Sequence, residues 1–83
     1  MSYAKLSPKA LGLALGLFWA LIVLSFGILA HFSPIGITFI NSVQTIYVGY
    51  SIDWSGIAIG TALAFIHLFV KGFIAAVIYN LFV

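Results

Sequence analysis

Two long apolar segments separated by a more polar connector dominate the sequence. The first, Ala10–Phe32, contains no charged residue, and the second, Gly56–Val83, contains only one, Lys71. About 20 consecutive apolar residues are enough for a helix to cross the hydrocarbon core of a bilayer. The pattern therefore predicts an all-α membrane protein with a single domain, residues 1–83. Its transmembrane helices, at about residues 10–32 and 56–80, would form an antiparallel hairpin.

The connector, residues 33–55, has a helical periodicity of its own. Ser33 and Pro34 suit the start of a helix, since serine caps the first turn and proline fits the first helical position. The apolar residues that then fall on one arc of a helical wheel are Ile35, Phe39, Ile40, Val43, Ile46, Tyr47 and Tyr50. This pattern predicts a short amphipathic helix, at about residues 35–48, that lies in the outer membrane interface. An irregular interfacial loop is the alternative.

The ends of the predicted spans carry residues typical of helix starts and of membrane interfaces. Ser7 and Pro8 suit the start of the first span, and Asp53 or Ser55 can cap the second. The aromatic residues expected at the interfaces are Tyr47, Tyr50 and Trp54 on the outer side and Tyr79 on the inner side.

Each predicted span has a face of small residues, which permits the close backbone approach that packs helices in lipid. The small residues expected at helix contacts are Gly12, Gly16, Ala20, Gly27, Gly56, Gly60 and Ala64. His67, Lys71 and Ala75 continue the face of the second span. Pairing the spans at matched depth would place Gly16 opposite Lys71, Ala20 opposite His67 and Gly27 opposite Gly60.

The composition supports a membrane protein and excludes several functions. Hydrophobic residues make up 65% of the chain and charged residues 5%, and a small soluble domain cannot hide that much apolar surface. The net charge of +2 comes without a basic cluster, so nucleic-acid binding is not expected. The absence of cysteine excludes disulfides and thiolate sites.

The charges also predict an orientation. Lys5 and Lys9 flank the first span, while the connector carries only Asp53, so the positive-inside rule places both termini in the cytoplasm and the connector outside. The first span is longer than the apolar region of a signal peptide, which favours an uncleaved span.

Lys71 is costly in this position, at roughly 2.5–3.5 kcal/mol for a charge at the centre of a spanning helix. Three explanations are open: it snorkels to the cytoplasmic headgroups, it pairs with a carboxylate or carbonyl of another subunit, or it lines a water-filled path. Asp53 belongs to the other side of the membrane and cannot pair with it.

His67 lies one turn before Lys71 on the same face. It can bond to a neighbouring carbonyl or hydroxyl, or it can ligate a haem or a chlorophyll, for which neutral imidazole is a usual ligand. His31, at the end of the first span, is a weaker candidate for such a ligand. Neither histidine has a second ligand at helical spacing, so no metal site is expected. The chain also lacks a nucleophile–base pair and paired carboxylates, so no catalytic residue and no enzymatic activity are expected.

The sequence resembles a family of small two-span prokaryotic membrane proteins often labelled "bacteriophage holin". The residues that carry the resemblance are Gly16-Leu17-Phe18-Trp19, Gly49-Tyr50-Ser51, Gly56, Gly60, Gly72-Phe73-Ile74 and Ile78-Tyr79-Asn80-Leu81-Phe82. The resemblance implies a place in a prokaryotic inner membrane, and the label implies membrane permeabilisation. Members often carry an acid where this chain has Lys71.

These observations favour a non-enzymatic accessory or structural subunit that packs, beside lipid, against other membrane subunits. One alternative is a holin-like pore formed by self-association, for which Thr61, His67 and Lys71 are the few wettable positions of the second span. The other is a small subunit that binds haem or chlorophyll through His67.

Overall fold

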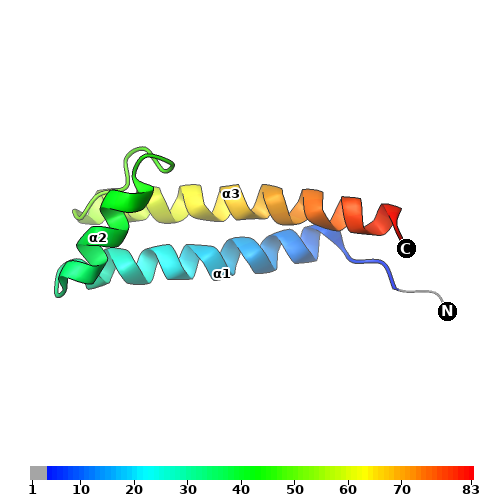
Figure 1. Cartoon of the computed structure of the whole chain (residues 1–83), viewed down its shortest axis with the longest axis horizontal. Coiled ribbons are helices and arrows are strands. Elements are labelled where there is room, and N and C mark those ends of the chain that lie inside the picture. The colour runs from blue at the N-terminus through cyan, green and yellow to red at the C-terminus, as the bar shows by residue number, and fades with distance from the viewer. Residues whose placement is uncertain (1–3) are drawn as a thin grey trace.

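The computed structural model describes residues 4–83, which form three helices: α1 (Pro8–Leu29), α2 (Pro34–Val43) and α3 (Trp54–Leu81). α1 and α3 lie antiparallel along the long axis, and α2 crosses the pair near its closed end (Figure 1). α1 has 22 residues and α3 has 28, and both are long and apolar enough to cross a bilayer. The prediction of two long apolar helices is therefore confirmed. Residues 1–3 lie outside the described residues.

Two of the three helices begin as their sequences predict. Ser7 Oγ accepts a hydrogen bond from the backbone N–H of Ala10 (3.2 Å), and Ser33 Oγ accepts one from that of Ile35 (3.3 Å). A proline follows each serine and fits the first turn because its missing N–H is not needed there. The two serine–proline pairs therefore mark the starts of α1 and α2.

α3 begins differently, since Asp53 occupies the N-cap position but makes no side-chain hydrogen bond to the helix. Its carboxylate instead accepts hydrogen bonds from the hydroxyls of Ser51 and of Ser55, the latter at 2.8 Å. These two bonds, that from Ser51 first, lower the pKa of the Asp53 carboxyl below its usual value. The only carboxylate side chain of the sequence is thus held within the local turn that leads into α3.

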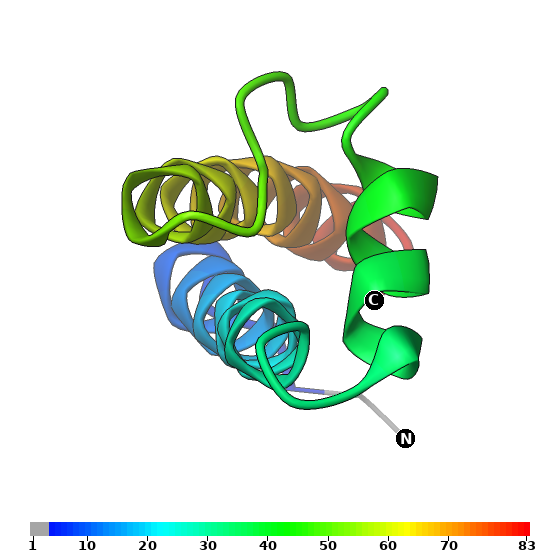
Figure 2. The same cartoon turned by 90° about the vertical axis from the view of Figure 1, so that its left-hand side faces the viewer.

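The connector helix is shorter than predicted, because α2 ends at Val43 and turns follow. Gly49 has a φ of +103°, a conformation that glycine adopts without the steric cost of a side chain. After α2 the chain loops over α3 and returns to the start of that helix, so the connector covers one side of the hairpin (Figure 2). This fold-back carries the tyrosines at 47 and 50 toward the helices.

The contact between α1 and α3 depends on glycines at the open half of the hairpin. A Cβ atom placed on Gly12 would lie 2.8 Å from the carbonyl oxygen of Phe69, and one on Gly16 would lie 2.8 Å from that of Phe65. A Cβ atom on Gly72 would lie 3.0 Å from the Cα atom of Gly12. The two backbones therefore approach too closely for larger residues.

The register of the hairpin differs from the one expected by about one to two turns of α3. Gly16 lies against Phe65 rather than opposite Lys71, and Gly27 lies against Ile57 rather than Gly60. The expected register assumed that the small faces of both spans meet along their whole length. The structure instead packs the first turns of α3 against the connector, which shifts α3 relative to α1.

The Gly56–Gly60 motif contacts the connector. A Cβ atom on Gly60 would collide with the ring of Tyr50, and one on Gly56 would collide with the side chain of Ser51. Gly36 of α2 similarly lies against the backbone of Ala30 at the end of α1. Glycines therefore allow α2 and the loop after it to pack close to the hairpin.

A side-chain amide closes the open end of the hairpin. Asn80 Nδ2 donates to the carbonyl oxygen of Leu6, and Asn80 Oδ1 accepts from the N–H of Leu6, both at 2.8 Å. This pair of hydrogen bonds joins the segment before α1 to the last turn of α3, so both ends of the described chain lie together (Figure 1).

Candidate functional site

Two tyrosines of the connector are buried between it and the hairpin. Tyr47 is 4% exposed and Tyr50 is 2% exposed, so the prediction that both belong to an outer aromatic belt is wrong. Trp54 alone of the three predicted residues is exposed, and its ring stacks on that of His31 at 4.5 Å. The reason is the fold-back after α2, which turns the two tyrosines inward where their hydroxyls find partners on α1 and α3.

Tyr47 bridges the two long helices through its hydroxyl. Trp19 Nε1 of α1 donates a hydrogen bond to Tyr47 Oη at 2.7 Å, and Tyr47 Oη lies 2.7 Å from His67 Nδ1 of α3. The Tyr47 and His67 rings also meet edge to face at 5.6 Å. One hydroxyl therefore joins residues from three separate segments, which we call the Trp19–Tyr47–His67 cluster.

The donors and acceptors of this cluster determine where its protons lie. The indole N–H of Trp19 can only donate, so it occupies a lone pair of Tyr47 Oη. The hydroxyl proton of Tyr47 is then free to be donated to His67 Nδ1, which must be unprotonated to accept it. The arrangement that satisfies the Trp19 N–H, the Tyr47 hydroxyl and His67 Nδ1 together has the ring proton of His67 on Nε2. This bears out the expectation that His67 bonds to a hydroxyl.

Tyr50 fastens the same connector to α1. Its hydroxyl donates to the carbonyl oxygen of Val23 at 2.7 Å, and burial raises the pKa of Tyr50 to about 12, so the phenol keeps the proton that it donates. Its ring packs edge to face on Phe39 of α2 at 6.4 Å between ring centroids. The buried residues of this core are Val23, Ala30, Ile40, Tyr47, Tyr50 and Ala64.

The two histidines predicted as possible cofactor ligands are far apart. His31 is exposed in the turn after α1 and stacks on Trp54, thirteen residues before His67 on α3. Thirteen residues correspond to roughly 20 Å along a helix, so the two cannot ligate one haem iron from opposite sides. Ligation by His67 alone through Nε2 would require a change in the proton arrangement of the cluster. Within residues 4–83, no group of three or more metal-ligating side chains is found.

Lys71 is exposed and lies beside the helix contact, not on it. The residues of α3 that are buried at this depth are Gly72 and Ala76, one position further along than the predicted face of Lys71 and Ala75. Asp53 precedes Lys71 by eighteen residues, or roughly 27 Å along α3. Any carboxylate that pairs with Lys71 must therefore come from another molecule.

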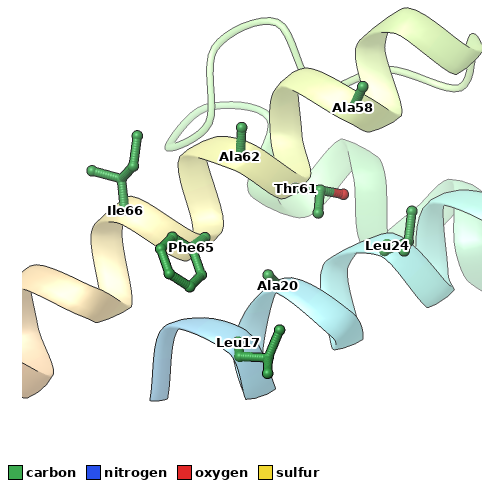
Figure 3. Close-up of a pocket in the computed structure, with 8 residues that line it drawn as sticks. All are labelled: Leu17, Ala20, Leu24, Ala58, Thr61, Ala62, Phe65 and Ile66. Atoms are coloured by element: carbon green, nitrogen blue, oxygen red, sulfur yellow. The ribbon is translucent and has the colours of Figure 1, made fainter. Parts of the chain in front are cut away.

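An apolar groove of about 590 Å³ lies between α1 and α3 (Figure 3). Its lining residues are Leu17, Ala20, Leu24, Ala58, Thr61, Ala62, Phe65 and Ile66. Thr61 Oγ1 is buried and has no hydrogen-bond partner within the described part of the chain. Unpaired buried hydroxyls are uncommon, and each carries a free-energy cost.

The sequence reasoning missed Trp19 and Tyr47 as members of a polar cluster. A tryptophan and a tyrosine each have a polar atom that usually finds a partner when buried, and this was the one signal available. No spacing rule could have paired them, because Tyr47 is separated from Trp19 by 28 residues and from His67 by 20.

In comparisons with known proteins, the chain matches no protein-family model, no curated protein and no solved structure.

Proposed function

We propose that this protein is a non-enzymatic accessory subunit that packs against other subunits of a membrane assembly. The observation that carries the proposal is a contrast between polar groups that are paired inside the hairpin and a charged group that is unpaired on its outer surface. The Trp19 N–H, the hydroxyls of Tyr47 and Tyr50, and the Nδ1 atom of His67 are paired within the chain. The Lys71 charge, in contrast, is exposed among apolar neighbours. A carboxylate of another chain would pair with this charge.

The dimensions of the hairpin support its placement in a bilayer. α1 has 22 residues, or roughly 33 Å of helix, against a hydrocarbon core of about 30 Å. α3 has 28 residues, or roughly 42 Å, so its first turns would extend beyond the core beside the connector. The large apolar side chains exposed on both helices, such as Phe18, Leu21, Ile66 and Ile74, would then face lipid.

The proposed topology has both termini in the cytoplasm. Reporter fusions at Val83 and within residues 42–45 should therefore report opposite sides of the membrane, with the connector outside, because Lys5 and Lys9 flank α1 while the connector carries no cation. Paired cytoplasmic and extracytoplasmic reporters at the same sites measure this directly. An external C-terminus would contradict the hairpin in the membrane.

The partner proposed for Lys71 is a carboxylate of another subunit. Lys71→Met should then weaken incorporation into the parent assembly, because it leaves that carboxylate unpaired in lipid at a cost of roughly 3–5 kcal/mol. The measurement is the amount of each variant that co-purifies with its partners from native membranes, identified by mass spectrometry. Lys9→Met is the matched control, since it removes a charge at the cytoplasmic end of α1 without changing the membrane depth of Lys71.

The outcome separates the possible roles of Lys71. If Lys71 only snorkels to the headgroups, Lys71→Met removes an unfavourable charge and should leave co-purification unchanged or slightly increased. Recovery of the chain without other subunits, as a ladder of its own oligomers, would contradict the accessory-subunit proposal. Abrupt lysis on controlled expression would favour the holin-like pore instead.

A pore is less well supported by the geometry of α3. It would need a continuous wettable stripe, for which Thr61, His67 and Lys71 were the candidates. His67 faces Tyr47 on the connector side, Thr61 lines the groove, and only Lys71 is exposed. Binding of haem or chlorophyll by His67 is also disfavoured, because the satisfied proton arrangement puts hydrogen on Nε2, where the ligand lone pair would have to be.

A further inference from the structure

One nitrogen of the His67 ring is used within the chain and the other is free. Nδ1 lies 2.7 Å from the Tyr47 hydroxyl, an arrangement that leaves the ring proton on Nε2. Among residues 4–83, this N–H has no acceptor, and Thr61 Oγ1 is the only buried side-chain nitrogen or oxygen without a partner. The Nε2–H group of His67 therefore lies unpaired at the surface of the hairpin, where a group from another molecule can reach it.

Lys71 places a second donor beside this N–H group. It follows His67 by four residues, so the two side chains share a face of α3, with their Cβ atoms roughly 5–6 Å apart. Side chains on a helix lean toward its N-terminus, so the side chain of Lys71 leans back over His67. The ammonium group and the Nε2–H group can only donate. The ligand that suits the pair is therefore an acceptor, and the charge of Lys71 favours an anionic one.

The same face of α3 continues as an exposed apolar stripe. Ile74 and Ile78 follow Lys71 by three and seven residues and are 51% and 50% exposed. Apolar residues at this spacing form the contact line of a helix that packs along another helix. The apolar groove between α1 and α3 is lined by other positions of α3 (Figure 3). The stripe therefore offers a surface for a neighbouring helix that brings an acceptor to His67 and Lys71.

The depth of the pair distinguishes such a helix from a lipid headgroup. Gly72 packs against Gly12, which follows Lys9 by three residues, so Lys71 lies about 5 Å further into the membrane than Lys9. Because α3 runs antiparallel to α1, His67 lies about 6 Å deeper again. A flexible lysine can reach a headgroup phosphate from its depth, but a histidine ring cannot. An acceptor that reaches both residues must therefore be carried into the hydrocarbon region by a helix.

We propose that His67 and Lys71 together bind the carboxylate of an aspartate or a glutamate in a membrane-spanning helix of a different subunit. One carboxylate oxygen would accept from Nε2–H of His67 and the other from the ammonium group of Lys71, which leaves neither donor unpaired. A parallel second copy of this chain cannot supply the carboxylate, because Asp53, its only acidic residue, lies at the other end of α3. This inference rests on the proposed function and specifies the chemistry of the partner.

A synthetic helix tests the site without knowledge of the native partner. The sequence contains no cysteine, so a donor dye can be attached to the full chain at Val83→Cys. The chain is placed in phosphatidylcholine vesicles with a leucine–alanine transmembrane peptide that carries an acceptor dye and a single glutamate at the depth of His67 and Lys71. Energy transfer measures association. The glutamate peptide should bind about tenfold or more tightly than the same peptide with glutamine, as expected for hydrogen bonds to a charged group.

Substitutions separate the contributions of the two donors. Lys71→Met should abolish the preference for glutamate, whereas Lys9→Met, the matched control for removal of a cation, should preserve it. His67→Asn retains an oxygen near the position of Nδ1 for the Tyr47 hydroxyl but has no donor at the position of Nε2, so it should reduce the preference several-fold. His67→Gln places an amide nitrogen near that position and should restore much of the preference.

Three outcomes would overturn the inference. The first is equal association, or none, of the glutamate and glutamine peptides with the native chain. The second is an undiminished preference in the His67→Asn chain, which would mean that Lys71 acts alone. The third is loss of the preference when phosphatidylglycerol replaces part of the phosphatidylcholine, which would identify a lipid phosphate as the ligand. Co-purification from native membranes tests separately whether the chain is a subunit, so failure of the carboxylate site and failure of the proposed function are distinguishable.

Discussion

Replacing Gly16 by leucine is expected to separate α1 from α3. Any Cβ atom at this position would lie 2.8 Å from the backbone carbonyl oxygen of Phe65, and a backbone atom cannot move aside as the end of a side chain can. Overpacking of a close contact ordinarily costs about 1–3 kcal/mol, and leucine adds three further carbons beyond the Cβ. Alanine is a weaker test, because its better helix propensity, worth about 1 kcal/mol, offsets part of the clash.

The measurement is the stability of the hairpin in detergent against added SDS, followed by the fluorescence of Trp19 in a Trp54→Phe background. Ala14→Leu is the matched control, since Ala14 lies on the exposed side of the same helix turn. The leucine at 16 should unfold at a much lower SDS fraction than the leucine at 14. Equal effects of the two leucines would mean that the small residues of α1 are not a packing surface.

Truncation of Tyr50 to alanine should have the second large effect, a loss of roughly 3–5 kcal/mol in the free energy of unfolding, as for other large buried aromatic residues. Tyr50 is among the largest fully buried side chains of the described structure, and its ring fills the space above Gly60. Its loss would leave a cavity between the connector, α1 and α3. The connector should then detach, with Tyr47 exposed to solvent.

The phenylalanine variant isolates the hydroxyl of Tyr50. Tyr50→Phe keeps the ring and loses only the hydrogen bond to Val23, so about 0.5–1.5 kcal/mol should be lost. Tyr79→Ala, at a residue that is 40% exposed, is the control for removal of a tyrosine as such and should have little effect. Limited proteolysis within residues 44–52 measures detachment of the connector. An undiminished resistance of Tyr50→Ala to proteolysis would contradict the packing role.

The helices could be predicted from the sequence because their signals are local. Length and hydropathy identify a spanning helix without knowledge of its neighbours, and the serine–proline pairs at Ser7 and Ser33 mark helix starts within a single turn. The burial of the small residues on both spans follows from the same kind of pattern. The end of α2 was harder to predict from the sequence, because the apolar arc continues to Tyr50 while the helix stops at Val43.

The candidate site depended on information that no local pattern contains. The expectation for His67 could name a hydroxyl as its partner but could not say which one, because Tyr47 reaches it through a loop whose path is decided by the turn at Gly49. Lys71 was expected on the packed face, and a rotation of the contact by one residue toward Gly72 leaves it exposed. A helical wheel with a 3.6-residue period cannot resolve such a shift over a long helix.

Hydropathy and helix periodicity were thus sufficient for the number, length and small-residue faces of the long helices, because these depend on each segment and its solvent. Tertiary structure alone decided three further features: the register of α1 against α3, the packing of Gly56 and Gly60 on the connector, and the union of Trp19, Tyr47 and His67. Each depends on the fit of particular side chains between segments that lie far apart in the chain. The close approach of backbones at Gly12 and Gly16, together with the insertion of Tyr47 and Tyr50, selects one arrangement from several that the apolar pattern allows equally.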